Sequence, residues 1–393
     1  MTRDFTAMAV QLDQHRSEHL SGTHRLPTPY IWQDPSSLPR RPWVYGRHLL
    51  RKQVAVTVAP GGVGKSSLTI VEGLAMVSER ELLGEWTAKG LNVWLYNLED
   101  PRDEMNLRIT AAMQHHNVQP DEVEGRLFVD TGRERELCTA MQTREGVVIV
   151  KPEIEELARE IAERQIDVMI VDPFVSSHQA GENDNVAIDL IAKEWARLAD
   201  RCNCAIELVH HTRKTNGVEA TTEDSRGGSA LLAAARSGRV LNRMTADERE
   251  QAGILPDDLT TYFTVTRDKS NLAPVGKRTW RRMASVELAN GESVGVAEVW
   301  EWPDTFDGFT SKDLLAVQHA IEGKLPRYSD QSGKDWAGVI VAEVLGLDAT
   351  NDRRRIRRMI EAWLHSGALI KSPIIDGNRR TRPCLEVGEW ASE

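Results

Sequence analysis

The sequence predicts an α/β fold: a mixed, mostly parallel sheet covered by helices, followed by a small C-terminal helix-turn-helix domain with a β-hairpin. Short apolar runs alternate with helical segments between residues 54 and 211, which is typical of parallel strands joined by helices. Beyond residue 311 the helical pattern returns and ends in two strands. Between these parts, four strand-like runs follow one another as in antiparallel hairpins, near residues 239–244, 262–267, 278–283 and 294–300.

Length and composition exclude several classes of protein. At 393 residues, with 40% hydrophobic and 27% charged residues, the chain has the size and composition of a soluble protein with one large and one smaller domain. No apolar run approaches the ~20 residues that span a bilayer, and residues 1–20 carry charges where a signal peptide would be apolar. The four cysteines lack metal-ligand spacing. We therefore expect a cytoplasmic protein with reduced cysteines and no membrane partner.

The N-terminal part divides into an arm and the entry to the main domain. Residues 1–30 are expected to form a free arm or a short helix that docks on a neighbouring subunit. Residues 31–305 are expected to form the main domain. Its entry segment is extended and rich in proline, and it carries Trp32 and Trp43. Such an aromatic residue could stack on a nucleotide base or pack at the edge of the core.

The stretch from Val54 to Leu68 predicts a strand, a glycine-rich turn and a helix, in the order that a phosphate-binding loop requires. Backbone N–H groups of such a loop point at phosphate, and the helix N-terminus adds positive charge. Lys65 would reach the β- and γ-phosphates, and the Ser66 hydroxyl would bind Mg²⁺. Ala59 stands where the first glycine of the motif is expected, and a methyl group is usually tolerated there. The residues expected to bind ATP and Mg²⁺ are Gly61, Gly62, Val63, Gly64, Lys65, Ser66 and Ser67.

Two more predicted strands end in acidic residues. Glu99 and Asp100 follow the run over residues 91–97, and Asp172 ends a short apolar run. The carboxyl ends of parallel strands border the ligand crevice of an α/β sheet. Glu99 is thus placed to orient and deprotonate a water that attacks the γ-phosphate, whereas Asp100 is expected to cap the following helix. Asp172 would hold Mg²⁺ through a water, opposite Ser66.

The run over residues 204–211 predicts a further buried strand that ends in two histidines. A single histidine is usually a core or surface residue, but His210 and His211 come at the carboxyl end of the strand, where a polar group can contact the γ-phosphate. Either histidine is therefore a candidate sensor of ATP. The following residues 213–224 are too hydrophilic for a core.

Six segments together resemble a known family. They are the loop over residues 59–66, Glu99-Asp100-Pro101, Ile170-Val-Asp-Pro173, Leu208-Val-His-His211, Ser225-Arg-Gly-Gly-Ser-Ala-Leu231 and Lys269-Ser-Asn271. Over residues 40–300 the chain resembles the RepA-type hexameric replicative helicases, which are RecA-like P-loop ATPases related to the DnaB type. The resemblance implies a hexameric ring of identical subunits, with ATP bound between subunits and single-stranded DNA in the channel. Such a motor would act in the replication of a plasmid, phage or mobile element.

The resemblance also implies roles for single residues. Lys65 and Ser66 are implied as ligands of phosphate and Mg²⁺. Glu99 is implied as the general base, Asp172 as the Walker B carboxylate and His211 as the γ-phosphate sensor.

The same resemblance implies an arginine finger, which one subunit supplies to the ATP of its neighbour. Arg236 occupies that place, where a fixed planar guanidinium would stabilise charge on the γ-phosphoryl oxygens. Arg226 and Lys269 are alternatives for this role. The alternative to a catalytic role is that Arg236 forms a local salt bridge within its own subunit.

The loops after Asp172 and His211 would face the DNA in such a ring. Residues 174–185 contain Glu182 and Asp184 but no lysine or arginine, whereas a DNA channel normally presents positive charge. The second loop mixes basic and acidic residues. A second function therefore stays open: a RecA-like, ATP-switched regulator that binds DNA or protein without unwinding activity.

Residues 311–393 are expected to form a winged-helix domain, because three helical segments precede two strands. The protein has a net charge of −10, yet this tail holds 13 basic and 12 acidic residues, so the acidity lies in the rest of the chain. Arginines on the third helix and at the wing tip form a footprint suited to duplex DNA. The alternatives are a solvated charged face or a winged helix that binds protein. The residues expected to contact DNA are Arg354, Arg357, Arg358, Arg379 and Arg380.

Overall fold

The computed structural model describes residues 27–212, 219–222, 228–255, 257–274, 276–375 and 380–392. The chain divides into two units, Met1–Arg41 and Pro42–Glu393. In the first unit, a short 3-10 helix, η1 (Pro35–Ser37), begins where the Asp34 side chain accepts a hydrogen bond from the Ser36 backbone. The expected N-terminal helix lies outside the described residues, as do Arg226 and Arg379.

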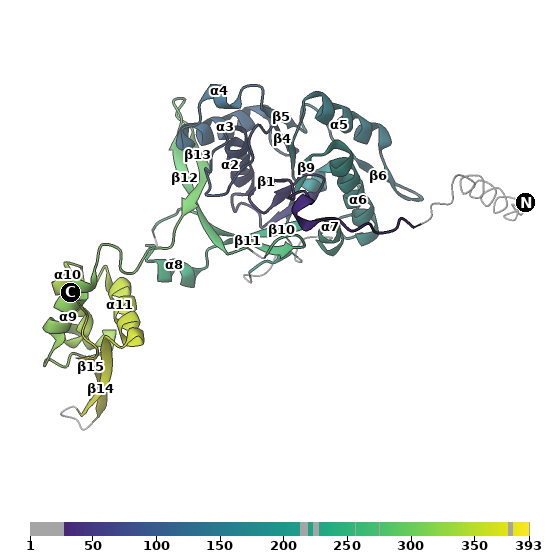
Figure 1. Cartoon of the computed structure of the whole chain (residues 1–393). Helices are drawn as coiled ribbons and strands as arrows, with labels where there is room; N and C mark the ends of the chain where they lie inside the picture. The colour runs from purple at the N-terminus through teal and green to yellow at the C-terminus, as the bar shows by residue number, and fades with distance from the viewer. Residues whose placement is uncertain are drawn as a thin grey trace, which may run out of the picture. The chain divides into compact units, whose positions relative to one another are not determined.

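The centre of the second unit is a nine-stranded sheet with the strand order β13-β12-β11-β10-β3-β9-β8-β4-β5 (Figure 1). The strands from β10 to β5 are parallel, and β11, β12 and β13 extend the sheet with antiparallel pairs. The fold is therefore α/β with a mostly parallel central sheet. The strands are β3 (Val54–Ala59), β4 (Val93–Asn97), β5 (Leu127–Thr131), β8 (Val168–Asp172), β9 (Ala205–His211), β10 (Ser237–Arg243), β11 (Tyr262–Ser270), β12 (Thr279–Glu287) and β13 (Ser293–Trp300).

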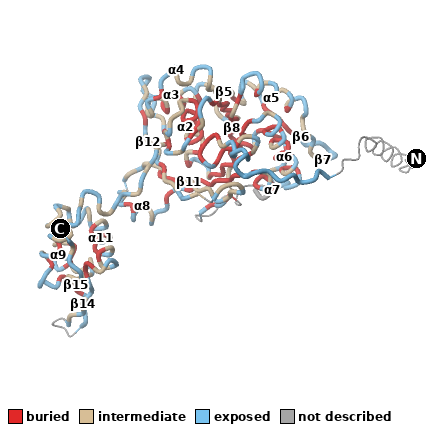
Figure 2. The backbone as a smooth tube through the Cα atoms, in the orientation of Figure 1, coloured by how far each residue is buried: buried red, intermediate tan, exposed pale blue. Residues whose placement is uncertain are grey.

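The central strands are apolar along their whole length because helices cover both faces of the parallel part of the sheet. Every residue of β3, β4 and β8 is buried, and the buried residues lie along the middle of the unit in Figure 2. Successive residues of β3 point to opposite faces, so Val56 and Val58 join one core cluster and Ala55 joins the other. The covering helices are α2 (Lys65–Val77) and α3 (Arg102–His116) on one face, and α5 (Lys151–Glu163), α6 (Asn185–Cys202) and α7 (Gly228–Ala234) on the other.

Smaller elements surround the sheet. The entry segment forms a β-ribbon rather than a purely extended chain, and residues 118–150 contain a short helix and a hairpin in addition to β5. That hairpin forms because Gly146 turns the chain at φ +125 and Ala140 packs in the core beside α6. These elements are β1 (Trp43–Tyr45), β2 (Leu49–Leu50), α4 (Pro120–Val123), β6 (Ala140–Thr143), β7 (Gly146–Ile149) and α8 (Ala246–Ala252).

A buried ionic network ties the middle of the sheet together. Arg239 on β10 donates to both carboxylate oxygens of Glu72 on α2, at 2.5 and 2.6 Å, and to Glu207 on β9 at 2.8 Å. His48 contacts the same oxygen of Glu207 at 3.1 Å. Burial alone would raise the pKa of Glu207, but Arg239 and His48 outweigh it and hold this pKa below its usual range. Buried charges are stable only when they are paired in this way, so the network fixes the relative positions of three elements.

The C-terminal part has its own core. Helices α9 (Ser311–Ile321), α10 (Ala337–Leu345) and α11 (Arg353–Ser366) precede an antiparallel pair of β14 (Leu369–Ile375) and β15 (Thr381–Val387). The order of helices and strands is the expected one, and each of these elements is confirmed. The third helix begins a few residues late because Asp348 accepts hydrogen bonds from the Thr350 and Asn351 backbones, which hold a turn before it. None of the helices in the described part of the chain is long and apolar enough to cross a membrane.

Candidate nucleotide-binding site

The glycine-rich loop connects the end of β3 directly to the start of α2. Gly62 and Gly64 have φ values of +67 and +109, the left-handed region that favours glycine, and α2 begins at the next residue, Lys65. Ala59 is fully buried as the last residue of β3, and Val63 is buried within the loop. Both side chains belong to the core cluster that includes α2. The buried side chains of Ala59 and Val63 therefore attach the loop to the core, and its glycines let the backbone turn tightly.

Two residues of the loop meet the carboxylate at the end of β8. The Ser66 hydroxyl donates to Oδ2 of Asp172 at 2.6 Å, and Nζ of Lys65 lies 3.9 Å from Oδ1 of Asp172. All three side chains come together because β3 and β8 are both parallel neighbours of β9, so their carboxyl ends reach the same edge. Burial raises the pKa of Asp172, although Lys65 and Ser66 act against this shift.

The donor set fits a hard cation such as Mg²⁺. Within the described residues, Oδ1 of Asp172 is buried and accepts no hydrogen bond. A buried carboxylate oxygen that accepts no hydrogen bond is costly even with the Lys65 ammonium 3.9 Å away, and a metal ion or a metal-bound water would satisfy it. Mg²⁺ prefers oxygen ligands such as the Ser66 hydroxyl and this carboxylate, and it keeps several waters. Ser66 and Asp172 are thus the residues that would hold the ion.

Glu99 and His211 add two further groups at the same edge. Nε2 of His211, at the end of β9, lies 3.8 Å from Oε1 of Glu99, whose side chain is half exposed. The Asn97 side chain accepts hydrogen bonds from the backbones of Glu99 and Asp100, at 2.9 and 2.7 Å, which holds the turn after β4. Burial and the nearby Lys65 lower the pKa of His211, so its imidazole is neutral at pH 7.

The structure separates the two histidines. His210 is buried, and its ring packs edge-on against Phe174 with ring centroids 5.8 Å apart. The alternation of a strand turns adjacent side chains to opposite faces, so only His211 reaches the crevice. His211 is the one that the geometry places beside Glu99.

Asp100 does not cap the helix that follows it. Helix α3 begins after Pro101, and no side chain caps its N-terminus within the described part of the chain. The prediction was wrong because Arg108, on the second turn of α3, pairs with the Asp100 carboxylate at 2.8 Å. A charge-assisted hydrogen bond from arginine is stronger than a hydrogen bond from a neutral backbone N–H. The Asp100 carboxylate therefore points to Arg108 and leaves the N-terminal N–H groups of α3 uncapped by it.

The two described candidates for the arginine finger, Arg236 and Lys269, lie toward the end of β3 that is opposite the loop. Arg236 immediately precedes β10, and its backbone N–H donates to the carbonyl oxygen of Val54, the first residue of β3. The six residues of β3 span ~20 Å, so Arg236 is far from the phosphate-binding loop of its own chain. The backbone N–H of Asn271, two residues after Lys269, donates to the carbonyl oxygen of Arg236 at 3.1 Å, so Lys269 lies in the same region. Burial and Arg236 lower the pKa of Lys269.

Two residues near the loop have contacts that no motif predicted. The Ser67 hydroxyl accepts a hydrogen bond from the Ala297 backbone at 2.9 Å, so it faces β13. Arg243 ends β10 and donates to the carbonyl oxygen of Gly62 at 2.6 Å. A strand that ends in arginine is a weak signal in sequence, because only the strand order shows that β10 lies beside β3.

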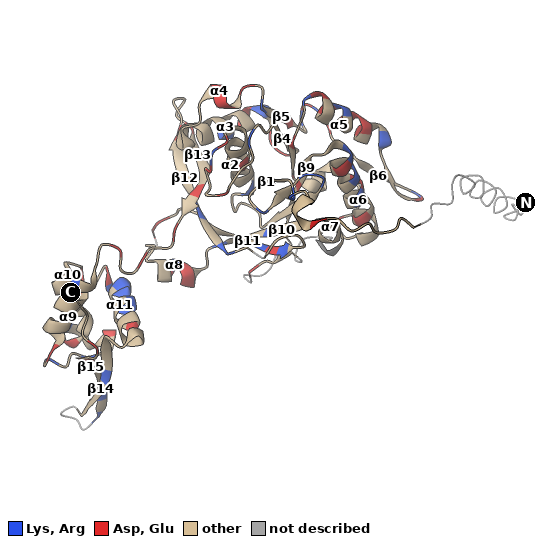
Figure 3. Cartoon of the chain, viewed as in Figure 1, with Lys and Arg blue, Asp and Glu red and all other residues tan. Residues whose placement is uncertain are grey.

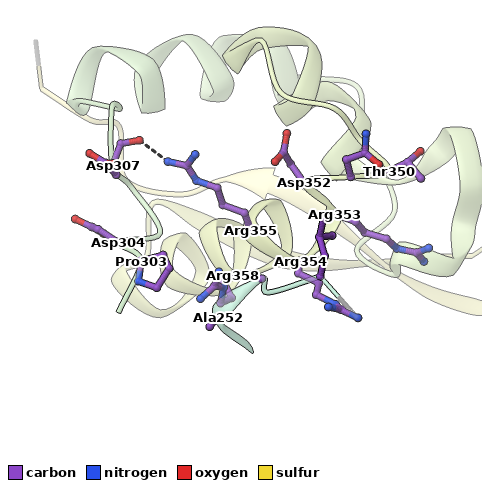
Figure 4. Close-up of a pocket in the computed structure, with 13 residues that line it drawn as sticks. Ala252, Pro303, Asp304, Asp307, Thr350, Asp352, Arg353, Arg354, Arg355 and Arg358 are labelled. Carbon is purple, nitrogen blue, oxygen red and sulfur yellow. Dashed lines mark hydrogen bonds between the residues drawn. The ribbon is translucent and has the colours of Figure 1, made fainter. Parts of the chain in front are cut away.

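The arginines of α11 are divided between solvent and their own domain, and Figure 3 shows the basic cluster at the start of this helix. Arg354 and Arg357 are exposed, and Arg357 pairs with Glu361 at 3.1 Å. Arg355 instead turns to the segment before α9, where it donates to the carbonyl oxygen of Thr305 at 3.0 Å and to that of Asp307, the contact drawn in Figure 4. The remaining predicted DNA contacts are Arg358, which is half-buried, Arg380, which is exposed, and Arg379, which lies outside the described residues.

Comparisons with known proteins agree with this geometry. A model of the AAA domain family matches residues 21–217, about half of the chain. No curated protein matches the chain in sequence. Among solved structures, the RadB recombinase is 13% identical, with a TM-score of 0.38 over 60% of this chain and 88% of that chain, a likeness too low to carry the assignment. The family match covers the loop, Glu99, Asp172 and His211 together, and the chain therefore belongs to the AAA domain family, with a P-loop nucleotide site at the carboxyl edge of its sheet.

Proposed function

We propose that this protein hydrolyses ATP and uses the reaction to act on DNA, as a ring-forming motor of the RepA and DnaB helicase type. One observation carries the ATPase part: the ends of β3, β4, β8 and β9 bring Lys65, Ser66, Glu99, Asp172 and His211 to one edge of the sheet. These are the groups that hydrolysis of a phosphoanhydride needs.

Each side chain has a distinct part in the proposed reaction. Lys65 neutralises charge on the β- and γ-phosphates, and Mg²⁺ held at Ser66 and Asp172 would supply further neutralisation. The half-exposed Glu99 carboxylate orients the attacking water and takes its proton. Neutral His211 lies close enough to Glu99 to link the position of this base to the presence of the γ-phosphate.

Ring assembly is proposed because both described candidates for the arginine finger lie away from the site of their own chain. Arg236 and Lys269 lie toward the end of β3 that is opposite the loop, so in this proposal they serve the ATP of another subunit. A planar guanidinium that reaches the γ-phosphoryl group from a neighbour would complete the site. Single-stranded DNA would then pass through the channel of the ring.

The C-terminal part is proposed to be a winged helix that binds duplex DNA. The helices α9 to α11 and the β14–β15 pair follow one another in the order of that fold. Arg354 and Arg357 are exposed on α11 and Arg380 is exposed directly before β15, in a protein with a net charge of −10. Attraction of DNA would therefore depend on this local patch.

The loop after β8 favours a second candidate function, an ATP-switched regulator that binds DNA or protein without unwinding. Residues 174–184 contain no lysine or arginine. Phe174 and Ser177 are fully buried there, His178 is nearly so, and Asp184 caps α6. A segment that is acidic and packed inward is poorly suited to gripping a phosphate backbone.

One experiment separates the two functions. ATP turnover by the full chain is measured with and without single-stranded DNA, and displacement of a labelled strand from a forked duplex is followed in parallel. A motor predicts turnover stimulated by DNA together with strand displacement. Turnover without either effect supports the regulator, and absence of turnover under all conditions contradicts both functions.

A further inference from the structure

We propose that Arg243 is a positioning residue that holds the phosphate-binding loop in the conformation that binds the phosphates of a nucleotide. The inference rests on the proposed ATP site and adds a residue that belongs to none of the motifs. Arg243 acts on the outside of the loop, through its backbone, and does not touch the reacting atoms.

The register of two strands places Arg243 beside the loop. Strand β10 is a parallel neighbour of β3, and Val240 is level with Val58. Arg243 and Gly61 each lie three residues beyond this pair. Because parallel strands advance by the same ~3.3 Å per residue, the arginine reaches the height of the loop where β10 ends.

The guanidinium bonds to the main chain of the loop. Nη2 of Arg243 donates to the carbonyl oxygen of Gly62 at 2.6 Å, and the carbonyl oxygen of Gly61 lies 3.5 Å from the same nitrogen. At Gly62, a Cβ atom would lie 3.1 Å from this nitrogen. The absence of a side chain at Gly62 therefore gives the guanidinium its place against the backbone, in addition to allowing φ of +67.

The charge of Arg243 is not compensated by an acidic residue within the described part of the chain, unlike that of neighbouring arginines. Arg239 pairs with Glu72 and Glu207, and Arg282 pairs with Glu298. Among the ion pairs of the described residues, none includes Arg243. Its positive charge therefore contributes to the electrostatic potential around the loop.

These contacts favour phosphate binding for two physical reasons. A cation bound to a peptide carbonyl polarises that peptide group, and this strengthens hydrogen bonds donated by N–H groups in the same chain of dipoles. An uncompensated positive charge also attracts the phosphates directly, and because Arg243 is exposed, solvent screens part of this attraction. Both effects act on bound ATP before and during hydrolysis, so they change affinity and KM more than kcat.

Binding of ATP and ADP to the full chain tests the proposal. Arg243→Ala should weaken both nucleotides about 10-fold, the order expected for loss of a charge-assisted hydrogen bond. It should raise KM by a similar factor and leave kcat within about 2-fold, since ground-state and transition-state binding are lost together. Arg243→Lys, which keeps the charge, should fall between wild type and Arg243→Ala. The matched control is Arg282→Ala, an exposed arginine of the same sheet that pairs with Glu298 and should leave affinity unchanged.

Several outcomes would overturn the proposal. Wild-type affinity in Arg243→Ala, with an unchanged unfolding temperature, would show that the contact has no role in binding. An equal loss of nucleotide affinity in Arg282→Ala would indicate that removing any positive charge from the sheet weakens binding. A loss for ATP but not ADP, or a fall in kcat at constant KM, would place Arg243 at the γ-phosphate instead. Failure of the wild-type chain to bind either nucleotide would contradict the ATP site itself, an outcome distinct from all of these.

Discussion

The carboxyl edge of the central sheet and helix α11 both concentrate functional side chains, but they arrive there by different routes. At the sheet edge, residues from distant parts of the sequence form two pairs: Lys65 lies 3.9 Å from Asp172, and His211 lies 3.8 Å from Glu99. On α11, five arginines occupy six consecutive positions and then diverge. The first site is built by tertiary structure, and the second is a cluster mainly in sequence.

The difference has a geometric cause. Parallel strands deliver one residue each to a common edge, so spacing along the chain is irrelevant to spacing in the site. A helix turns by about 100° per residue, so successive side chains point in different directions. Arg355 consequently turns inward to the Thr305 carbonyl and Arg358 is half-buried, which leaves Arg353, Arg354 and Arg357 as the exposed set on α11. Adjacent basic residues in a sequence therefore overstate the surface that can bind DNA.

The largest effect is expected at the sheet edge, from Glu99→Gln. Loss of the general base should slow ATP hydrolysis by roughly 10²-fold or more while ATP still binds. The measurement is single-turnover hydrolysis beside equilibrium binding of ATP. Asp100→Asn is the control, because Asp100 pairs with Arg108 and should retain most activity. Normal hydrolysis by Glu99→Gln would mean that another residue is the base and that this edge is assembled differently.

Mixing two variant proteins tests whether Arg236 of one subunit completes the ATP site of its neighbour. Arg236→Ala alone should bind ATP and lose most hydrolysis, because the finger stabilises the transferring phosphoryl group. Mixed with Glu99→Gln subunits, it should recover part of the activity at interfaces that pair an intact Glu99 with an intact Arg236. Co-assembly is verified by crosslinking. Absence of any recovery in mixed assemblies would argue against a role in trans and turn attention to Lys269.

The buried network below the edge should make stability depend on pH. Burial and the nearby Arg239 lower the pKa of His48 to about 4, whereas an unfolded histidine titrates near 6.5. The unfolded chain therefore takes up this proton first, so stability is complete above pH 6.5 and is lost as pH falls toward 4. The loss from His48 amounts to about 3 kcal/mol.

Urea unfolding at several pH values measures this loss. His48→Gln should reduce the pH dependence between 6.5 and 4, whereas His319→Gln, which removes an exposed histidine, should leave it unchanged. The same pH dependence in wild type and His48→Gln would show that the network is not the origin of the acid sensitivity.

A smaller effect is expected on α11. If about four arginines of the C-terminal part meet phosphates, log affinity for duplex DNA should fall with log salt at a slope near −3.6, or −0.9 per contact. Replacing the exposed Arg354 and Arg357 by alanine should bring the slope near −1.8 in fluorescence anisotropy with the full chain. Arg355→Ala should leave it unchanged, because that side chain holds the Thr305 carbonyl. Equal slopes in all three proteins would refute the distinction between exposed and inward arginines.

The same contrast explains how far the sequence could predict the structure. Strand β3 and helix α9 follow from local patterns, because alternating apolar residues and a capping threonine act over a few residues. The order of strands depends on long-range pairing, which local patterns do not encode. Arg243 could not be assigned for that reason, since its contact with Gly62 requires β10 to lie beside β3.

Competition between side chains limits prediction in a second way. Asp100 has the residue type and position of a helix cap, yet its carboxylate forms an ion pair with Arg108. Gly146 closes a hairpin in a segment with no clear strand period. In each case the outcome depends on which partner is nearest in space, and that is known only when the chain is folded.

The central claim is that the strand ends form one nucleotide site around Lys65, and equilibrium titration with Mg²⁺ and ATP tests it most directly. Wild-type protein should bind ATP saturably and hydrolyse it, and Lys65→Ala should lose hydrolysis and most of the affinity with its unfolding temperature unchanged. Lys52→Ala, which removes a half-exposed lysine paired with Asp200, should behave as wild type. ATP binding and turnover at wild-type level in Lys65→Ala would contradict the account.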